Sequence, residues 1–517
     1  MKVDIRRFIK NNKVKIINTS NLRKKILIID RGRDDSVFSN SLSGYICNKY
    51  RFCKVDLLSE NTKNHELIKV YESFNIQKKY DSSILNFNIK NLILYLKTLM
   101  TLTLSYIKIS LFGFNWLVKK YRLGDILIGD LIYDSYIRYD LQFLNESIFN
   151  TKFLKILTIA IYRYYFFKKL VDKNNYSLLI CNTPGNLYSG LGLRVFLKNK
   201  VPAVCILSTY FRYYKKLGEV YEHYFKTHKK DLKKITRDKG WLEKTEIYIK
   251  NRWKGNIVQR DAKKALIGAK ISKDQIFRKL KINEKHYSRI GYFAPHAFSD
   301  ANYLGGYFLF KGYYEHFYKT INYIKEQKNI LWFVKEHPSS KVFGEKGLVE
   351  KIVKNSNAKN ILFCPKYLST LKLLSFSDIV VTGRGTIGQE AALLGIKPII
   401  AGNTHYNSLG FTLEPKTHKN YRKLLLNTKS NYKLTKGQIF KAKISVYNSL
   451  IKKHEQKSKV YPIARSTDVD LKKKKVVQRF DYNFNFYKEL NTNLKTHSIL
   501  NDSFYLALKS ILLKNIS

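Results

Sequence analysis

The stretch Ser377–Gly402, SDIVVTGRGTIGQEAALLGIKPIIAG, has the pattern of a strand, a tight loop, a helix, a short turn and a second strand. Ile379–Val381 is a short apolar β-branched run, as a buried parallel strand requires. Helical spacing of apolar residues begins at Thr386, and Gly395 stands where a helix C-cap is expected. Ile399–Ala401 then has the composition of the next strand. The stretch therefore predicts a strand–helix–strand unit.

The loop of this unit predicts a phosphate site. Gly383, Gly385 and Gly388 are expected to let the backbone turn sharply and approach a ligand closely. The loop Thr382–Thr386 would hold the phosphate through its N–H groups at a helix N-terminus. Glu390 follows about one turn into the helix, where a carboxylate can bind a ribose hydroxyl. The alternative is a unit without a ligand, in which Glu390 is a solvated helix residue.

A histidine follows a second predicted strand. Asn329–Lys335, NILWFVK, has the composition of a strand, and Glu336, His337 and Pro338 come directly after it. In open α/β sheets, ligands bind at the carboxyl ends of the strands. Near neutral pH a histidine there can donate to a phosphate oxygen or protonate a leaving group. His337 is therefore a candidate catalytic residue, the alternative being a structural histidine.

These segments resemble the nucleotide-sugar half of GT-B glycosyltransferases. The resemblance is closer to the capsule and surface-polysaccharide families, which include Kdo-transferring and sialyl-transferring enzymes. It covers roughly Ile282–Tyr421. The matching residues are Lys335–Pro338 (KEHP), Thr382–Glu390 (TGRGTIGQE), Gly395–Pro398 (GIKP) and Ala294–Ala301 (APHAFSDA), the last following a predicted strand at Ser288–Phe293. The resemblance implies a nucleotide-sugar donor, and it places His296 among the donor-binding residues.

The first half of the chain predicts another Rossmann-like unit, because strand-like and helix-like runs alternate there. The expected elements are a strand at Lys24–Asp30, a helix at Phe38–Tyr50, strands at Cys53–Leu57 and Tyr176–Asn182, a helix at Tyr188–Leu197 and a strand at Val201–Ser208. In GT-B enzymes the acceptor base often lies on a loop of this half. Asp34 and Asp35 follow the first strand and are candidates, the alternative being a solvated turn or a helix N-cap.

A second carboxylate candidate lies in Gly124–Arg138, GDILIGDLIYDSYIR. Asp130, Asp134 and Arg138 are four residues apart, so on a helix they share one face. Asp134 could form an intrahelical ion pair with Arg138. It could also be an acceptor-side carboxylate that the arginine holds. Asp134 thus joins Asp34 and Asp35 as a candidate for the acceptor base, and Asp35 and Asp134 are the two that we place in the catalytic site.

Composition limits the partners. The chain has 517 residues, 44% of them hydrophobic, which suits two or three domains with cores of their own. Its net charge of +56 attracts anionic lipid and polyanions. No nucleic-acid-binding motif accompanies the charge, so no specific nucleic acid partner is expected. The five cysteines have no metal-ligand spacing and suit reduced thiols in a cytosolic protein.

Membrane attachment is expected to be peripheral. The N-terminal run MKVDIRRFIKNNKVK lacks the apolar region of a secretory signal. Leu92–Leu117 is the most apolar long stretch, but Lys97 and Lys108 interrupt it, so a membrane-spanning helix is not expected. A buried or two-sided amphipathic helix is favoured there, and a helix in the membrane interface is the alternative. The protein is predicted to be cytoplasmic and attached to the inner face of the cell membrane in a salt-sensitive way.

Together these observations predict an α/β, GT-B-like fold with two Rossmann-like domains facing a cleft, helical insertions and a C-terminal crossing helix at Ser503–Leu513. The expected domains are an acceptor domain over 1–280, a nucleotide-sugar domain over 281–425 and a helical extension over 426–517. The expected activity is transfer of a sugar from a nucleotide-sugar to a glycan or lipid-linked acceptor of a capsule, O-antigen or lipopolysaccharide type.

No metal or cofactor is expected, because inverting enzymes of this fold neutralise the leaving phosphate with helix dipoles and basic residues. Asp468-Val469-Asp470 has the spacing of a metal-binding D-x-D motif, but it lies in a polar, lysine-flanked segment and is discounted. Two alternatives from other classes stay open. One is a transferase of polyol phosphate in wall-polymer synthesis, and the other is a non-catalytic membrane scaffold of the same fold.

Overall fold

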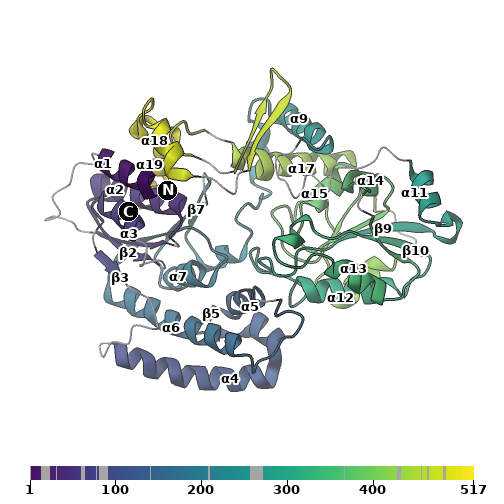
Figure 1. Cartoon of the computed structure of the whole chain (residues 1–517), viewed down its shortest axis with the longest axis horizontal. Coiled ribbons are helices and arrows are strands. Elements are labelled where there is room, and N and C mark those ends of the chain that lie inside the picture. Colours follow the sequence, from purple (N-terminus) through teal and green to yellow (C-terminus); the bar gives the residue numbers. More distant parts are fainter. Residues whose placement is uncertain are drawn as a thin grey trace.

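The structure is a computed structural model, and it describes residues 2–12, 24–30, 32–59, 65–76, 78–80, 91–139, 141–207, 210–256, 272–365, 367–427, 432–455, 457–462, 465–480 and 485–516. The chain forms two large β-sheets that lie side by side, each with helices on both faces (Figure 1). Each sheet is built mainly from parallel strands connected through helices. This is the α/β, GT-B-like arrangement of two Rossmann-like units, as predicted.

The first sheet has the strand order β3-β2-β1-β6-β7-β8. Its strands are β1 (Lys24–Asp30), β2 (Cys53–Ser59), β3 (Lys78–Tyr80), β6 (Tyr176–Cys181), β7 (Ala203–Leu207) and β8 (Tyr210–Tyr214). Only the β7–β8 pair is antiparallel. Successive residues of a strand face opposite sides, so Ile26 and Ile28 of β1 contribute to one core, and Leu27 and Ile29 to another.

Helices cover both faces of the first sheet. One layer contains α1 (Lys2–Asn11), α2 (Asp34–Arg51), α3 (His65–Glu72), α18 (Phe486–Asn493) and α19 (Ser503–Asn515). On the other face α7 (Leu187–Lys198) lies against the sheet, followed outward by α5 (Gly129–Ile137) and α6 (Thr151–Lys173). Because α19 packs on α2, the chain returns to its first half at its end, which confirms the predicted crossing helix.

The second sheet has the strand order β11-β10-β9-β12-β13, and all its strands are parallel. The strands are β9 (Arg289–Ala294), β10 (Ile330–Val334), β11 (Ile361–Phe363), β12 (Ile379–Thr382) and β13 (Ile399–Ile400). One face carries α12 (Tyr313–Ile324), α13 (Leu348–Asn355) and α16 (His418–Leu425), and the other carries α11 (Lys273–Lys279), α14 (Thr370–Ser375) and α15 (Ile387–Leu393). The βαβ unit predicted at Ser377–Gly402 is therefore confirmed as β12-α15-β13.

A further layer packs on α15. It contains α8 (Asp231–Thr236), α9 (Trp241–Trp253), α17 (Lys436–Val446) and the hairpin β14 (Arg465–Asp470) and β15 (Lys475–Phe480). The sequence did not predict this hairpin, whose alternation of polar and apolar residues is weak. Asp468 and Asp470 lie in the first strand of this hairpin. A second small hairpin is formed elsewhere by β4 (Arg122–Leu123) and β5 (Ile126–Leu127). The predicted domain limits stay a prediction.

The long helix α4 (Leu92–Lys120) lies along the outer side of α6, at the lower edge of the molecule in Figure 1. It is long and apolar enough to cross a membrane, and among the described residues no other helix meets that test. Only 22% of its most apolar 18-residue stretch is buried in the structure. The expectation of a buried or two-sided amphipathic helix is therefore wrong, because α6 covers one side and nothing in the described chain covers the opposite, apolar side.

A buried ion pair connects α5 to α7. Arg194 donates from Nη1 and Nη2 to the two carboxylate oxygens of Asp130, at 2.6 and 2.7 Å, and also donates to the carbonyl oxygen of Leu127. Both side chains are almost fully enclosed, with exposures of 3% and 1%. Asp130 therefore pairs with another helix and not with the residues that share its face on α5.

Removing one partner of this pair should be costly, because the other charge stays buried. We expect Asp130→Ala to lower the free energy of unfolding by roughly 3–5 kcal/mol, measured by urea denaturation. The matched control is Asp125→Ala, which removes an exposed ion pair with Lys198 at the end of α7. The control should leave the urea midpoint almost unchanged. Equal midpoints for the two variants would contradict a stabilising role for the buried pair.

Candidate functional site

Three neighbouring strands of the second sheet bring the predicted residues together. β9 lies between β10 and β12, and all three run in the same direction. His296 follows β9, His337 follows β10 and the loop Gly383–Thr386 follows β12. Their carboxyl ends meet at one edge of the sheet, which is where open α/β sheets bind ligands. The segments that the sequence singled out separately are therefore adjacent in the fold.

Two histidines stack at this edge. The ring of His296 lies 4.8 Å from that of His337 and 4.3 Å from that of Tyr313, nearly parallel to both. Burial lowers the pKa of His296, which favours its neutral form. Nδ1 of the half-buried His337 accepts a hydrogen bond from the N–H of Ser339 at 3.2 Å. The neutral His337 ring therefore carries its proton on Nε2, which can act as a donor.

A buried carboxylate holds the two histidine loops together. Glu345, which is 2% exposed, accepts hydrogen bonds from the N–H groups of Phe298 and Ser299 at 2.7 and 2.6 Å. These residues belong to the loop that carries His296, whereas Glu345 lies in the segment that follows His337. Burial raises the pKa of Glu345, against the effect of these hydrogen bonds. Sequence reasoning missed Glu345, because no motif marks a carboxylate in a loop.

The two residues before His337 have structural partners. Lys335 donates from Nζ to the carbonyl oxygen of Leu368 at 2.6 Å. Glu336 accepts from the N–H of Gly347 at 2.7 Å. Both bonds fix the chain just after the end of β10, and of the KEHP motif it is the histidine that belongs to the stacked rings.

The glycines of the loop after β12 serve close packing. None of the three has a positive φ angle, so it is not the backbone conformation that requires glycine at these positions, and close approach to a ligand stays a prediction. A Cβ on Gly383 would lie 3.2 Å from the ring of Tyr313, and one on Gly388 would lie 2.2 Å from the hydroxyl of Tyr406. That hydroxyl donates to the carbonyl oxygen of Gly385 at 2.6 Å. Gly388 therefore makes room for a tyrosine that supports the loop.

Arg384 is a buried cation in the same loop. Its Nη2 donates to the carbonyl oxygens of Gly306 and Tyr307, both at 2.8 Å, and the guanidinium lies over the ring of Phe308. No described group accepts a hydrogen bond from its Nε or Nη1. Burial lowers the pKa of Arg384, although neighbouring tyrosines oppose that shift. A buried cation with unused donors beside two histidines can stabilise an anion.

Glu390 is buried and not solvated, so its reading as an exposed helix residue is wrong. One carboxylate oxygen accepts two hydrogen bonds from Arg252 of α9, at 3.0 and 2.5 Å. Gln389 is buried as well and bonds to Ser445 and His405. A ribose contact of Glu390 stays a prediction, and it would share the carboxylate with Arg252.

Asp134 connects the two halves of the molecule. Its two oxygens accept hydrogen bonds from the N–H groups of Asn302 and Tyr303, both at 3.1 Å, and its side chain is 3% exposed. The side chain of Asn302 in turn accepts from the N–H of Tyr313, the tyrosine that stacks on His296. This is the environment of a positioning residue. A role as acceptor base would require an acceptor hydroxyl to reach this enclosed carboxylate, and the alternative ion pair with Arg138 is not formed.

Asp34 and Asp35 occupy the first turn of α2, and Arg33 is the N-cap residue. Asp35 is partly exposed and lies 3.4 Å from Nε of Arg33. Burial and the neighbouring Asp35 raise the pKa of Asp34. Among the described residues, no hydrogen bond or ion pair connects the carboxylate of Asp35 with the histidine site. Its role as acceptor base stays a prediction.

A second basic cluster lies at the end of β13 and has no counterpart in the predictions. The rings of His223 and His405 are 5.2 Å apart, and Nζ of Lys453 lies 5.1 Å from the centre of the Tyr210 ring. Burial lowers the pKa of Lys453 to about 7. The three basic residues come from distant parts of the sequence, so no local pattern could have indicated them. In the described chain, no three His, Cys, Asp or Glu side chains gather as a metal site requires.

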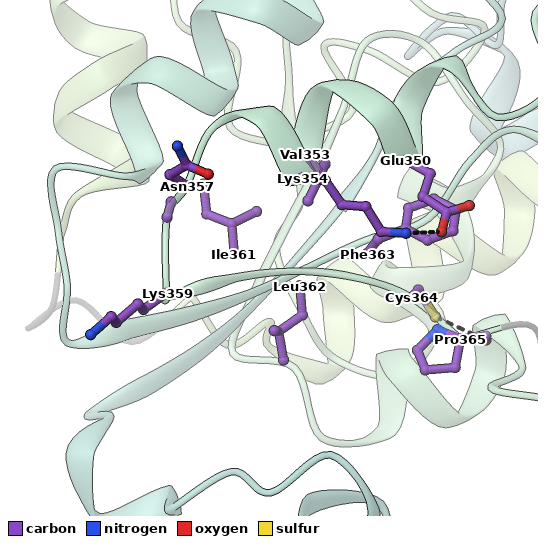
Figure 2. A pocket seen from close by; sticks show the side chains of 11 residues that line it. Glu350, Val353, Lys354, Asn357, Lys359, Ile361, Leu362, Phe363, Cys364 and Pro365 are labelled. Carbon is purple, nitrogen blue, oxygen red and sulfur yellow. Dashed lines mark hydrogen bonds and ion pairs between the residues drawn. The ribbon is translucent and has the colours of Figure 1, made fainter.

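A pocket of about 620 Å³ lies elsewhere. It follows the open edge of the outer strand β11, between that strand and α13 (Figure 2). An ion pair of 2.9 Å between Glu350 and Lys354 lies in its wall. None of the predicted site residues lines it. Its place along an outer strand suits a surface depression, so the strand-end residues remain the candidate site.

Comparison with known proteins gave no family. No protein-family model and no curated protein matches the chain. Similar solved structures include KpsC of Thermosulfurimonas dismutans, described as a beta Kdo 2,4 transferase, with 16% identity over 50% of this chain and 64% of that chain and a TM-score of 0.28. The chain thus spans less than two thirds of that protein.

Two other solved structures are similar over longer stretches. The beta Kdo 2,7 transferase KpsC of the same organism is 14% identical over 64% of this chain and 89% of that chain, with a TM-score of 0.29. The UDP-GlcNAc 2-epimerase of Methanocaldococcus jannaschii is 12% identical over 82% and 99%, with a TM-score of 0.25. Similarities at these TM-scores carry no argument about activity, and the fold stated above follows from the order and direction of the strands.

The titration of Asp134 gives a testable pH dependence. Burial raises its pKa to about 7, against the opposing effects of Arg138 and the two N–H donors. A carboxyl with a raised pKa stabilises the fold at low pH and loses that contribution as pH rises through about 7. Asp134→Asn should be less stable than the wild type throughout, because an amide nitrogen accepts no hydrogen bond. In urea denaturation, the difference in the free energy of unfolding between the wild type and the variant should be larger at pH 5 than at pH 8. A deficit that grows with pH would contradict this assignment.

Proposed function

We propose that this protein is a glycosyltransferase of the GT-B-like fold. It would transfer a sugar from a nucleotide-sugar donor to a growing surface polysaccharide of the capsule, O-antigen or lipopolysaccharide type. The sequence segments KEHP and TGRGTIGQE, which resemble those of the Kdo-transferring and sialyl-transferring enzymes, support the proposal. The donor would bind at the carboxyl edge of the second sheet, and the acceptor would approach from the first half of the chain.

The observation that carries the proposal is the pair of stacked histidines at the ends of β9 and β10, next to the loop after β12. A donor diphosphate or monophosphate carries negative charge that grows as the sugar–phosphate bond breaks. Nε2 of His337 can donate to a phosphate oxygen there, and Arg384 supplies a buried positive charge nearby. Neutral His296 would fix the orientation of the His337 ring by stacking.

Several details belong to the same proposal. The acceptor base would be Asp35, and the enzyme would act without a metal ion. The protein would lie on the cytoplasmic face of the cell membrane, where a lipid-linked acceptor is within reach. Its positive charge would attract the anionic lipid headgroups of that membrane.

Nucleotide binding is the first test of the proposal. We expect one of CMP, UDP, GDP and CDP to raise the Tm of the protein, because a ligand that binds only the folded state stabilises it. The nucleotide that raises Tm identifies the donor base. No rise with any of the four would contradict a donor site and favour a non-catalytic scaffold.

His337→Ala tests the role of the histidine. The assay uses a nucleotide-sugar that contains the nucleotide found to raise Tm. We expect the rate of sugar transfer to fall by about 10²-fold or more, because the group that gives a proton or hydrogen bond to the leaving phosphate is lost. The variant should keep the wild-type Tm. The matched control is His497→Ala, an exposed histidine after α18, which should keep full activity. Wild-type turnover in His337→Ala would remove this residue from the mechanism.

The ribose contact of Glu390 can be separated from its ion pair. We expect Glu390→Ala to weaken binding of the same nucleotide by about 1.5–3 kcal/mol in calorimetry. The variant should also unfold more easily, because the guanidinium of Arg252 stays buried without a partner. The double variant Glu390→Ala/Arg252→Met should regain stability and still bind the nucleotide weakly. Wild-type affinity in the double variant would show that Glu390 serves only the ion pair.

A further inference from the structure

The helix α4 presents a mainly apolar surface to the outside, with exposed Thr103 and Ser110 among the apolar side chains. Nine large apolar side chains of this helix are exposed, with exposed fractions from 45% at Leu92 to 73% at Leu111. They are Leu92, Ile93, Leu96, Leu99, Met100, Leu104, Ile107, Leu111 and Phe112, which we call the α4 face. Single exposed leucines are ordinary, but a contiguous apolar patch of this length marks an interaction surface.

The α4 face has a regular geometry. With 3.6 residues per turn, Ile93, Leu104 and Leu111 point in nearly the same direction. Lys97 and Lys108 are exposed and lie together along one border of the face, eleven residues apart. This is the pattern of an interfacial helix, in which apolar side chains enter the lipid and lysines at the border reach the headgroups.

The opposite side of α4 packs along α6. The hydroxyls of Thr101 and Tyr165 are 2.7 Å apart, and the rings of Phe114 and Phe153 are 5.1 Å apart. These contacts lie on either side of the non-helical Gly113 (φ 70°, ψ −176°), so both parts of α4 are kept against the protein. Lipid on all sides would require their loss. The geometry therefore suits a helix that lies in the plane of a membrane, with α6 behind it.

Charge identifies the occupant of the face. The segment Leu92–Lys120 contains no Asp or Glu, and Lys120 is exposed at its end. α6 begins beside that end with exposed Lys152 and Lys155. A second copy of the chain would bring the same lysines and the same net charge of +56 against them, and like charges repel. An anionic lipid surface provides both an apolar layer and opposite charge.

We propose that the α4 face docks on an anionic membrane and lies in its interface, with Ile93, Leu104 and Leu111 in the acyl boundary and Lys97 and Lys108 at the headgroups. The inference extends the membrane attachment proposed above by naming the surface that makes it. It also changes the expected response to salt, because ionic screening weakens the lysine contacts and leaves the apolar contacts in place. Its test needs no enzymatic activity, so it can fail independently of the proposed function.

The test is co-sedimentation of the full-length protein with vesicles of phosphatidylcholine alone or with 30% phosphatidylglycerol added, about one lipid in three as in anionic membranes. The wild type should bind the anionic vesicles at least about tenfold more tightly. It should remain partly bound in about 1 M NaCl, where the Debye length falls to about 3 Å. Complete release by salt, or equal binding to both vesicles, would overturn the proposal.

Variants locate the contact. Ile93→Glu/Leu104→Glu places each glutamate four residues before a lysine of the same helix, which supports folding. It should bind anionic vesicles at least about tenfold more weakly than the wild type. The matched control Val3→Glu/Val477→Glu makes the same charge change at exposed apolar residues of α1 and β15 and should bind within about twofold of the wild type. Equal losses in the two variants would show that net charge alone, and not the α4 face, attaches the protein.

Two further measurements separate the contributions and the alternative occupant. Ile93→Gln/Leu104→Gln removes apolar area without adding charge, and its binding should be weaker in high salt as well as in low salt. Sedimentation equilibrium without lipid should give a monomer. A dimer that Leu104→Glu dissociates would assign the α4 face to a second copy of the chain and overturn the proposal.

Discussion

The candidate site depends on two buried carboxylates that accept hydrogen bonds from one loop. Glu345 binds the N–H groups of residues 298 and 299, and Asp134 binds those of residues 302 and 303. A loop this close to the core would otherwise leave its backbone donors without partners, at a large desolvation cost. With both ends of the loop held, His296 lies against His337 and Tyr313 in a single arrangement. The chemistry proposed for His337 therefore rests on acids that need not touch a substrate.

Much of the fold was predictable from local patterns. β1 has the predicted bounds, Lys24–Asp30, around its apolar run, and β12-α15-β13 follows the predicted βαβ unit, because buried parallel strands are short and uninterrupted. The strand-end positions of His337 and of the glycine loop were predictable for the same reason. The positive φ of Gly395 after α15 confirms its predicted role at the helix end.

The parts that sequence reasoning missed depend on contacts between distant residues. Glu390 was expected to be free for a ligand, but Arg252 reaches it from a helix that lies 138 residues away in the sequence. Gly388 was assigned to ligand approach, and its actual neighbour is the hydroxyl of Tyr406. Lysines at positions 97 and 108 argued against a membrane-spanning helix, and a buried or two-sided amphipathic helix was favoured, yet the structure leaves one apolar side of this helix exposed with the lysines at its border. In each case the partner of the residue, and not its type, decides the role.

One hydrophobic core runs through both halves of the molecule. It includes Leu27 and Ile29 of the first sheet, Phe293 and Val334 of the second, and Phe308 in the segment between β9 and α12. Separation of the halves would expose apolar side chains of both, although each half also has a core of its own. Fragments cut between the two sheets should therefore aggregate or remain partly unfolded when expressed alone. For the same reason, a substitution in the shared core of one half should also destabilise the other half. The effect of natural sequence variants on stability should therefore be assessed over the whole chain.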